Sequence, residues 1–279
     1  MIGPGDDPID GKSNLVRYYQ QYYDEQARLR GDGSALEFER TREIILRYLP
    51  KPPAGVLDVG GGPGIYSAWL AKLGYTVRLV DIVPKHIEQA LALSSAEPQN
   101  AFSAEIGDAT ELHVPDSSQD MVLELGPLYH LIDRTRRIKA LSEARRALVN
   151  GGCTIAAAIT RYASVFTGVI DNALDDVDFK PVFERDLIDG QHLPHIPRDF
   201  TTAHFHHPDE LKHEMEEAGF ANVETLAVEG PFWLLRDLDD RWRDATSRRQ
   251  LLYALSKIEE EPSLMGASLH FVCVGRKLG

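Results

Sequence analysis

The stretch VLDVGGGPG at residues 56–64 constrains the fold of this chain more than any other. An apolar run that contains one acid, Asp58, ends in three consecutive glycines, and a helix-like segment begins at Ile65. A strand, a glycine turn and a helix in this order predict a βα unit with a sharp turn. A side chain at Gly60 or Gly62 would keep the backbone away from a ligand, and glycine tolerates the positive φ that sharp turns use. We therefore expect a ligand to bind on this turn.

The spacing of the glycines separates two classes of ligand. A dinucleotide fingerprint needs a third glycine or alanine at the position that Ile65 occupies here. Asp58 stands two residues before Gly60, and a carboxylate attracts a cation and repels a diphosphate. The pattern Asp-x-Gly-x-Gly-x-Gly resembles motif I of the class I S-adenosylmethionine-dependent methyltransferases. The resemblance implies that Gly60 and Gly62 pass under the methionine part of the cofactor and that Asp58 helps to hold its ammonium group.

Two later segments extend the resemblance. A second strand, expected at residues 76–80, ends at Asp81, and an acid at this tip accepts hydrogen bonds from a ribose diol in both nucleotide and S-adenosylmethionine folds. The resemblance adds the next residue, Ile82, to the cofactor site. A third strand near residues 101–106 leads into Gly-Asp-Ala, which looks like the adenine corner of the family. There Asp108 takes the exocyclic amine, and the backbone at Ala109 meets the ring.

The most probable place for chemistry follows the fourth strand, expected at residues 121–125. Open α/β sheets bind ligands at the carboxyl ends of their strands, so Leu125 and Gly126 are expected beside the cofactor. Tyr129 and His130 follow, and they are the candidates for a base or a substrate anchor. In the alternative interpretation, Tyr129 only packs and His130 caps the next helix.

Two segments are expected to cover the site. Residues 1–50 form an N-terminal arm and helical cap, in which four tyrosines at helical spacing either pack against the core or face the sulfonium through cation–π attraction. Tyr22 represents this cluster among the expected cofactor contacts. Residues 161–206 follow the fifth strand without a long periodicity, which favours a lid over the substrate. This segment is alternatively an exposed histidine-rich loop, and a metal site at His204, His206 and His207 is disfavoured, so no metal is expected.

Alternating strands and helices up to Ile159 predict an α/β fold with a doubly wound, Rossmann-like sheet. A helix at residues 134–149 should be closed by Asn150-Gly151-Gly152, before a fifth strand at 154–159. Later strands are expected at 223–228 and 271–274, and the resemblance implies seven strands with the last one antiparallel. The methyltransferase domain is thus expected to span residues 51–279. His270 precedes the last strand, and the sequence does not say whether it faces the pocket.

The charge, the cysteines and the apolar runs of the sequence limit which partners and which cellular compartment we expect. The 279 residues carry a formal net charge of −13, which argues against nucleic acid because phosphate contacts need clustered Lys and Arg. The cysteines, Cys153 and Cys273, lie in apolar runs and are expected to be buried thiols. With no signal-peptide pattern and no apolar run near the ~20 residues that span a bilayer, we expect a cytoplasmic protein, monomer or homodimer, away from membranes.

The expected function is transfer of a methyl group from S-adenosylmethionine to an oxygen or nitrogen atom of a small molecule. The resemblance is to the small-molecule, type 11/25-like members of the superfamily. Two alternatives remain: a non-catalytic protein that binds S-adenosylmethionine, and an NAD-dependent oxidoreductase. The acceptor itself is left open, because the terminal segments and the lid, which set it in this superfamily, match only in general layout.

Overall fold

A seven-stranded sheet runs through the molecule. In the computed structural model, which describes residues 11–25, 34–193 and 200–279, its strands are β1 (Gly55–Val59), β2 (Thr76–Asp81), β3 (Ser103–Ile106), β4 (Gln119–Glu124), β5 (Leu148–Ile159), β8 (Ala221–Ala227) and β9 (His270–Arg276). They lie in the order β3-β2-β1-β4-β5-β9-β8. The first five pair in parallel, whereas β9 pairs antiparallel with both β5 and β8. The predicted Rossmann-like sheet with an antiparallel last strand is confirmed.

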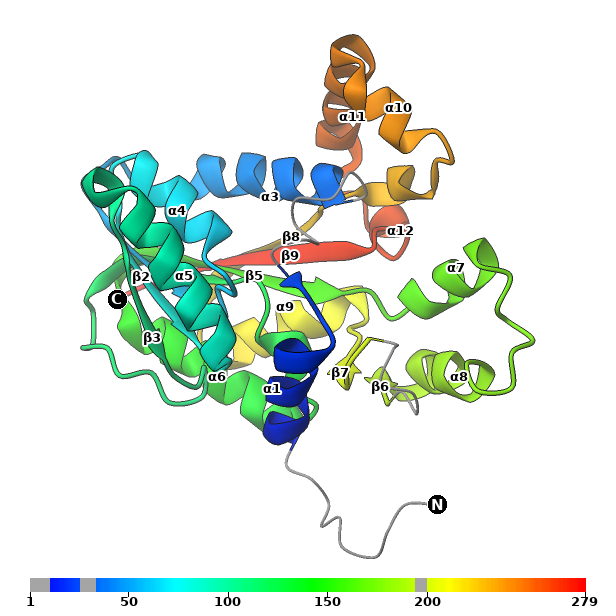
Figure 1. Cartoon of the computed structure of the whole chain (residues 1–279), viewed down its shortest axis with the longest axis horizontal. Helices are drawn as coiled ribbons and strands as arrows, with labels where there is room; N and C mark the ends of the chain where they lie inside the picture. The colour runs from blue at the N-terminus through cyan, green and yellow to red at the C-terminus, as the bar shows by residue number, and fades with distance from the viewer. Residues whose placement is uncertain (1–10, 26–33, 194–199) are drawn as a thin grey trace, which may run out of the picture.

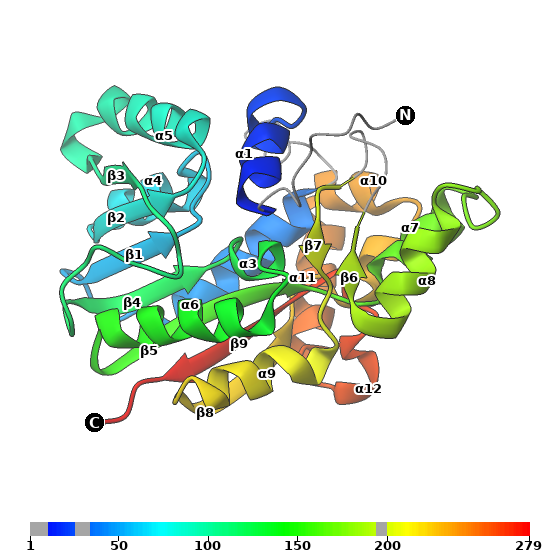
Figure 2. The same ribbon diagram turned by 90° about the horizontal axis from the view of Figure 1, so that it is seen from below.

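Helices cover both faces of this sheet, as Figures 1 and 2 show. One face packs against α3 (Ala35–Tyr48), α4 (Ile65–Lys72) and α5 (Pro84–Ala96), and the other against α6 (Arg134–Ala147) and α9 (Pro208–Glu217). Strand β1 shows why: Val56 faces the first layer and Leu57 the second, and both are fully buried. Because alternate side chains point to opposite faces, a strand covered on both sides is largely apolar, and the buried carboxyl group of Asp58 is the exception in β1.

The Asn150-Gly151-Gly152 turn does not close a helix, contrary to the prediction. Helix α6 ends at Ala147, and the three residues lie inside β5. The N–H of Gly151 donates to the carbonyl of Lys277 at 2.8 Å, and the N–H of Lys277 donates to Gly152 at 3.0 Å. Pairing with the end of β9 satisfies these backbone groups, so a tertiary contact overrides the local turn signal.

The segment after β5 has more regular structure than predicted. It contains α7 (Ala163–Ile170), α8 (Lys180–Asp189) and a two-stranded ribbon of β6 (Gln191–His192) and β7 (Ala203–His204). The N–H of His206 donates to the carbonyl of Ile159 at 2.8 Å, which ties the end of the segment back to β5. Residues 194–199 of the expected lid lie outside the described residues. In both views α7 and α8 project beyond the sheet.

The remaining described helices lie near the two ends of the chain. Helix α1 (Gly11–Gln21) packs its tyrosines on Val83, beside the start of α5. Between β8 and β9 lie the short η4 (Gly230–Leu234), α10 (Leu238–Arg243), α11 (Ala245–Ile258) and α12 (Pro262–Met265). The first ten residues of the expected N-terminal arm lie outside the described part. No described helix combines the length and apolar character needed to cross a membrane.

Candidate active site

One cavity opens at the carboxyl ends of β1, β2 and β4. It is lined by all but one of the residues that the sequence places in the cofactor or catalytic site: Asp58, Gly60, Gly62, Asp81, Ile82, Asp108, Ala109, Leu125, Gly126, Tyr129 and His130. These residues come from four separate stretches of chain. The topology of a parallel sheet brings them together, because the carboxyl ends of its strands meet at one edge.

The glycine turn adopts the backbone that only glycine takes easily. Gly60 and Gly62 have φ of 68° and 56°, in the left-handed region. A Cβ on Gly60 would also stand 2.8 Å from Cδ of Pro127, in the loop after β4. The N–H of Gly62 donates to a carboxylate oxygen of Asp81 at 2.9 Å. The turn is therefore packed against the ends of two neighbouring strands, β2 and β4.

Asp58 presents a buried carboxyl group to this cavity. The side chain accepts a hydrogen bond from the hydroxyl of Ser67 at 2.6 Å, and the residue is 1% exposed. Burial raises the pKa of Asp58 to about 6; the Ser67 hydrogen bond opposes the rise and the nearby charge of Asp81 adds to it. A cation bound in the cavity would favour the ionised form.

The two other predicted acids are anchored at the tips of their strands. Asp81 accepts the N–H of Val83 at 2.8 Å, and its carboxylate lies 3.2 Å from Nδ1 of His86. Burial raises the pKa of Asp108, but hydrogen bonds from Thr110 and from Lys12 outweigh it and hold the value below the usual range. Both carboxylates are thus fixed in orientation, with Asp108 partly exposed.

His130 lies at the centre of an aromatic group over the cavity. Its Nε2 is 3.0 Å from the hydroxyl oxygen of Tyr19, and its ring centroid is 4.7 Å from that of Tyr129. Burial lowers the pKa of His130 to about 4, so the imidazole is neutral at pH 7. The cap of the following helix is Asp133, which accepts the N–H of Thr135 at 2.8 Å. The alternative role of His130 as a helix cap is therefore wrong.

Tyr22, the remaining predicted contact, does not line the cavity. It is 56% exposed, whereas Tyr18 and Tyr19 are each 8% exposed, and Tyr19 lines the cavity. Helix α1 ends at Gln21, so Tyr18 and Tyr19 lie on the helix and Tyr22 follows its last turn. The sequence does not reveal where this helix ends. Tyr19, and not Tyr22, is therefore placed to contact a ligand in the cavity.

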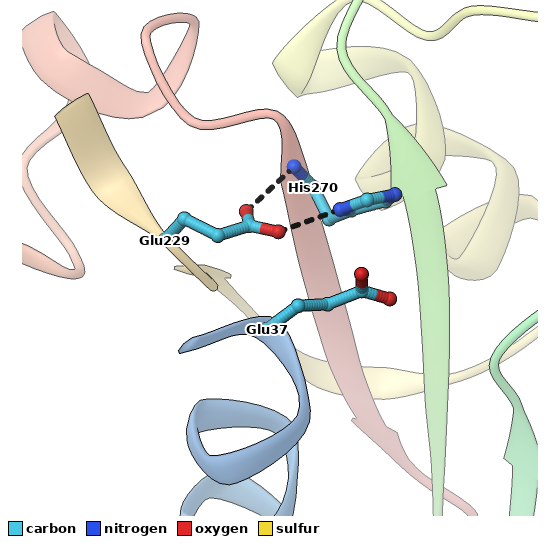
Figure 3. Close-up of side chains that lie close together, drawn as sticks. All are labelled: Glu37, Glu229 and His270. Carbon is cyan, nitrogen blue, oxygen red and sulfur yellow. Dashed lines mark hydrogen bonds and ion pairs between the residues drawn. The ribbon is translucent and has the colours of Figure 1, made fainter. Parts of the chain in front are cut away.

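The far end of the cavity carries two residues to which the sequence assigned no role. Glu37 and His270 both line it, and Nδ1 of His270 is 2.6 Å from a carboxylate oxygen of Glu229. Figure 3 shows the three side chains converging from separate elements. Among the described residues, they form the one group of three whose ligand-type atoms come within 4.8 Å of one another, close enough to hold a metal ion. His204 and His206 instead approach Glu210 and Glu214, at 3.4 Å each.

Known proteins match both the sequence and the fold. Residues 56–152 match the family model of a methyltransferase domain. The chain is 28% identical over 198 residues to an S-adenosyl-L-methionine-dependent Diels-Alderase of Talaromyces variabilis, over 68% of this chain and 61% of the relative. It is 31% identical over 94 residues to the ajmaline N-methyltransferase of Rauvolfia serpentina, over 33% of this chain and 32% of the relative.

A solved structure extends the comparison to the whole fold. The phosphoethanolamine N-methyltransferase 2 of Haemonchus contortus, solved with S-adenosyl-L-methionine, aligns with a TM-score of 0.63 at 16% identity, over 100% of this chain and 62% of that one. The chain thus spans less than two thirds of the length of each of these three proteins. Residues 56–152 thus match a methyltransferase domain, and the order of the strands together with the structural alignment shows that the whole chain has the fold of a solved methyltransferase that binds S-adenosyl-L-methionine.

Proposed function

We propose that this protein transfers the methyl group of S-adenosylmethionine to an oxygen or nitrogen atom of a small-molecule acceptor. The observation that carries the proposal is the convergence of Asp58, Asp81 and the Tyr129-His130 pair on one cavity at the edge of the sheet. A net charge of −13 disfavours a nucleic acid acceptor. Ile65 stands where a dinucleotide fingerprint needs glycine or alanine, which disfavours the oxidoreductase alternative.

The donor set of the cavity suits the cofactor. Asp58 and the Gly60–Gly62 turn would hold the methionine end, with the buried carboxylate facing the ammonium group. Asp81 and Ile82 would hold the ribose, and Asp108 with Ala109 the adenine. Leu125 and Gly126 would lie beside the sulfur. Carboxylates at the ammonium and ribose positions match a ligand that is cationic and rich in hydrogen-bond donors.

When bound, S-adenosylmethionine supplies an activated methyl group that transfers by direct displacement. The work of the protein is then mainly to position the acceptor and to exclude water, and good orientation can supply ~7–11 kcal/mol of the barrier. Tyr19 and His130 cover the cavity, and the neutral imidazole accepts or donates a hydrogen bond according to its tautomer. The aromatic face of Tyr19 also suits a positively charged sulfur.

Calorimetry and a turnover assay test this proposal. Protein stripped of carried-over ligand should bind S-adenosylhomocysteine at one site. With a panel of small phenols and amines as acceptors, it should release S-adenosylhomocysteine from S-adenosylmethionine. His130→Ala should lower the rate at least tenfold and leave the affinity for S-adenosylhomocysteine unchanged. Absence of binding heat contradicts the proposal, and a tenfold loss of cofactor affinity at an unchanged rate contradicts the role of His130.

A second candidate is a cyclase that binds the cofactor without consuming it. The match to the Talaromyces variabilis Diels-Alderase covers 68% of this chain, about twice the share covered by the ajmaline enzyme. A Diels-Alder reaction joins a diene and a dienophile and transfers no methyl group. Under this alternative, the protein binds S-adenosylmethionine with the affinity expected above, yet no acceptor in the panel leads to release of S-adenosylhomocysteine.

A further inference from the structure

A buried carboxylate clamps the side chain of His270 at the start of β9. One oxygen of Glu229 is 2.6 Å from Nδ1 of the ring, and the other accepts the backbone N–H of His270 at 2.8 Å. Ser268, which is fully buried, has its hydroxyl 3.2 Å from that second oxygen. Glu229 itself is 3% exposed. The backbone and the ring of His270 are therefore held by the same carboxylate, as the dashed lines in Figure 3 show.

This clamp selects one tautomer of the imidazole. An ionised carboxylate only accepts hydrogen bonds, so Nδ1 carries the hydrogen that faces Glu229. In the neutral ring Nε2 then holds the lone pair, and Figure 3 shows this second nitrogen on the side of the ring away from Glu229. A carboxylate partner also makes the opposite nitrogen more basic. The arrangement prepares Nε2 to accept a proton.

His270 and Glu37 stand where two pockets meet. Both line the cofactor cavity, and both also line a second pocket bounded by Leu36, Trp233 and Leu235. Among the described residues, the lining of the second pocket adds one cation, Arg236, and one anion, Asp239. The junction brings two carboxylates, Glu37 and Glu229, next to the ring of His270.

The junction of the two pockets, at Glu37 and His270, lies near the Leu125-Gly126 corner where the methyl group of the cofactor is expected, but it does not overlap that corner. His270 is paired with Ile159, at the carboxyl end of β5, and β5 lies between β9 and β4. Neighbouring strands are about 4.8 Å apart, and each residue of a strand rises about 3.3 Å. Glu124 pairs with Ala156, three residues before Ile159, so the backbones of His270 and of the end of β4 are roughly 14 Å apart. That separation leaves room for a small acceptor between His270 and the Leu125-Gly126 corner.

We propose that Glu37 and His270 bind and deprotonate the amine group of the methyl acceptor, with Glu229 as a positioning residue; this rests on the proposed function. Glu37 attracts the ammonium form, and its neighbour His270 offers Nε2. The N–H bond breaks, its electron pair stays on the amine nitrogen, and the proton passes to Nε2 and then to solvent. The apolar wall of Trp233 and Leu235 takes the hydrocarbon part of the acceptor.

A metal ion is the less favoured occupant of the same group. The facing atoms of Glu229 and His270 are already bonded to each other at 2.6 Å. A metal held by all three residues would have to compete with His270 for Glu229, because both oxygens of that carboxylate already accept hydrogen bonds from His270. An organic ammonium group binds without disturbing either residue.

Histidine NMR on the full chain, saturated with S-adenosylhomocysteine, tests the inference. The probe is benzylamine, with benzyl alcohol and benzoate as matched neutral and anionic probes. Benzylamine should shift the His270 ring signals, identified by their loss in His270→Gln, while the other two probes leave them unchanged. Glu37→Gln should weaken benzylamine binding at least tenfold and leave the affinity for S-adenosylhomocysteine unchanged. Glu39→Gln, which makes the same charge change on the same helix beside Arg42, should change neither.

Two further measurements complete the test. The ¹⁵N shifts of His270 should report hydrogen on Nδ1 in the wild type and lose that signature in Glu229→Gln, which a purely structural Glu229 would not do. Equal shifts with benzyl alcohol, or no shift with benzylamine, overturn the inference. Manganese broadening of His270 that Glu37→Gln abolishes also overturns it, in favour of a metal site. Failure to bind S-adenosylhomocysteine would instead contradict the proposed function.

Discussion

At the scale of single residues, the buried carboxyl groups of the sheet divide into two kinds. Asp58 lines the cavity and has Ser67 as a hydrogen-bond partner. Glu124, at the end of β4, is fully buried, lies outside the cavity lining, and has no hydrogen-bond partner for either oxygen among the described residues. The first kind can gain from a bound cation, whereas the second only costs free energy when it ionises.

Asp58 should make cofactor binding depend on pH. Its pKa of about 6 in the ligand-free protein means that the carboxyl group is neutral below pH 6. The affinity for S-adenosylhomocysteine, measured by calorimetry, should therefore fall up to tenfold per pH unit below about pH 6 and stay level above it. Asp58→Asn should bind more weakly and lose this dependence. A wild-type affinity that stays constant from pH 5 to pH 7.5 would refute the role of Asp58.

Glu124 should make the folded state less stable as the pH rises. Burial raises its pKa to about 8, above the value near 4.5 in the unfolded chain. Between these two values the native state holds the extra proton, so stability is full below about pH 4.5 and is lost as the pH rises toward 8, by at most about 1.4 kcal/mol per unit. Denaturant unfolding of Glu124→Gln should lack this slope. The exposed Glu111→Gln should behave like the wild type.

At the scale of elements, the sequence predicted most of the boundaries of the helices and strands. The predictions that failed have one cause in common. The strand expected at 76–80 lies within one residue of β2, and the helix expected at 134–149 lies within two residues of α6. The local signal failed at residues 150–152, where hydrogen bonds with Lys277 decide the backbone, and at the end of α1, where it did not distinguish Tyr19 from Tyr22. In both places a distant segment supplies the information that the local pattern lacks.

Helix α1 tests whether the N-terminal segment caps the cofactor. Tyr19 lines the cavity and contacts His130, while Tyr22, which follows the helix, is exposed. Tyr19→Ala should therefore weaken the binding of S-adenosylmethionine about tenfold, since a cation–π contact with the sulfonium contributes about 1 kcal/mol or more. Tyr22→Ala, the matched control, should bind like the wild type. Equal losses in both variants would indicate damage to the helix and not a lost contact.

At the scale of the whole molecule, the site is a product of topology. The cofactor end of the cavity uses loops after β1, β2, β3 and β4, and the far end adds Glu37 from α3 and His270 from β9. These residues span more than 200 positions of sequence. A ligand that occupies the cavity therefore contacts both halves of the sheet and stabilises the folded chain as a unit.

Stabilisation of the folded chain by a ligand in the cavity should appear as a rise in the melting temperature. A ligand at 100 times its Kd stabilises the native state by about 2.7 kcal/mol, which for a chain of 279 residues should raise Tm by several degrees. S-adenosylhomocysteine should produce this shift and NAD should not. A shift with NAD alone would revive the dinucleotide interpretation of the turn at residues 60–64.

The sequence by itself determined the class of fold and the expected cofactor, and it singled out three acids, Asp58, Asp81 and Asp108, that line one cavity. That information is local. A few neighbouring residues are enough to identify the glycine turn, the carboxylates at the strand tips and the change from strand to helix. Only the tertiary structure decided that Tyr19 and not Tyr22 faces the cavity, and that His270 meets Glu229 and Glu37 at its far end. Those contacts join segments separated by up to 230 residues, and no local pattern encodes which distant side chains will meet.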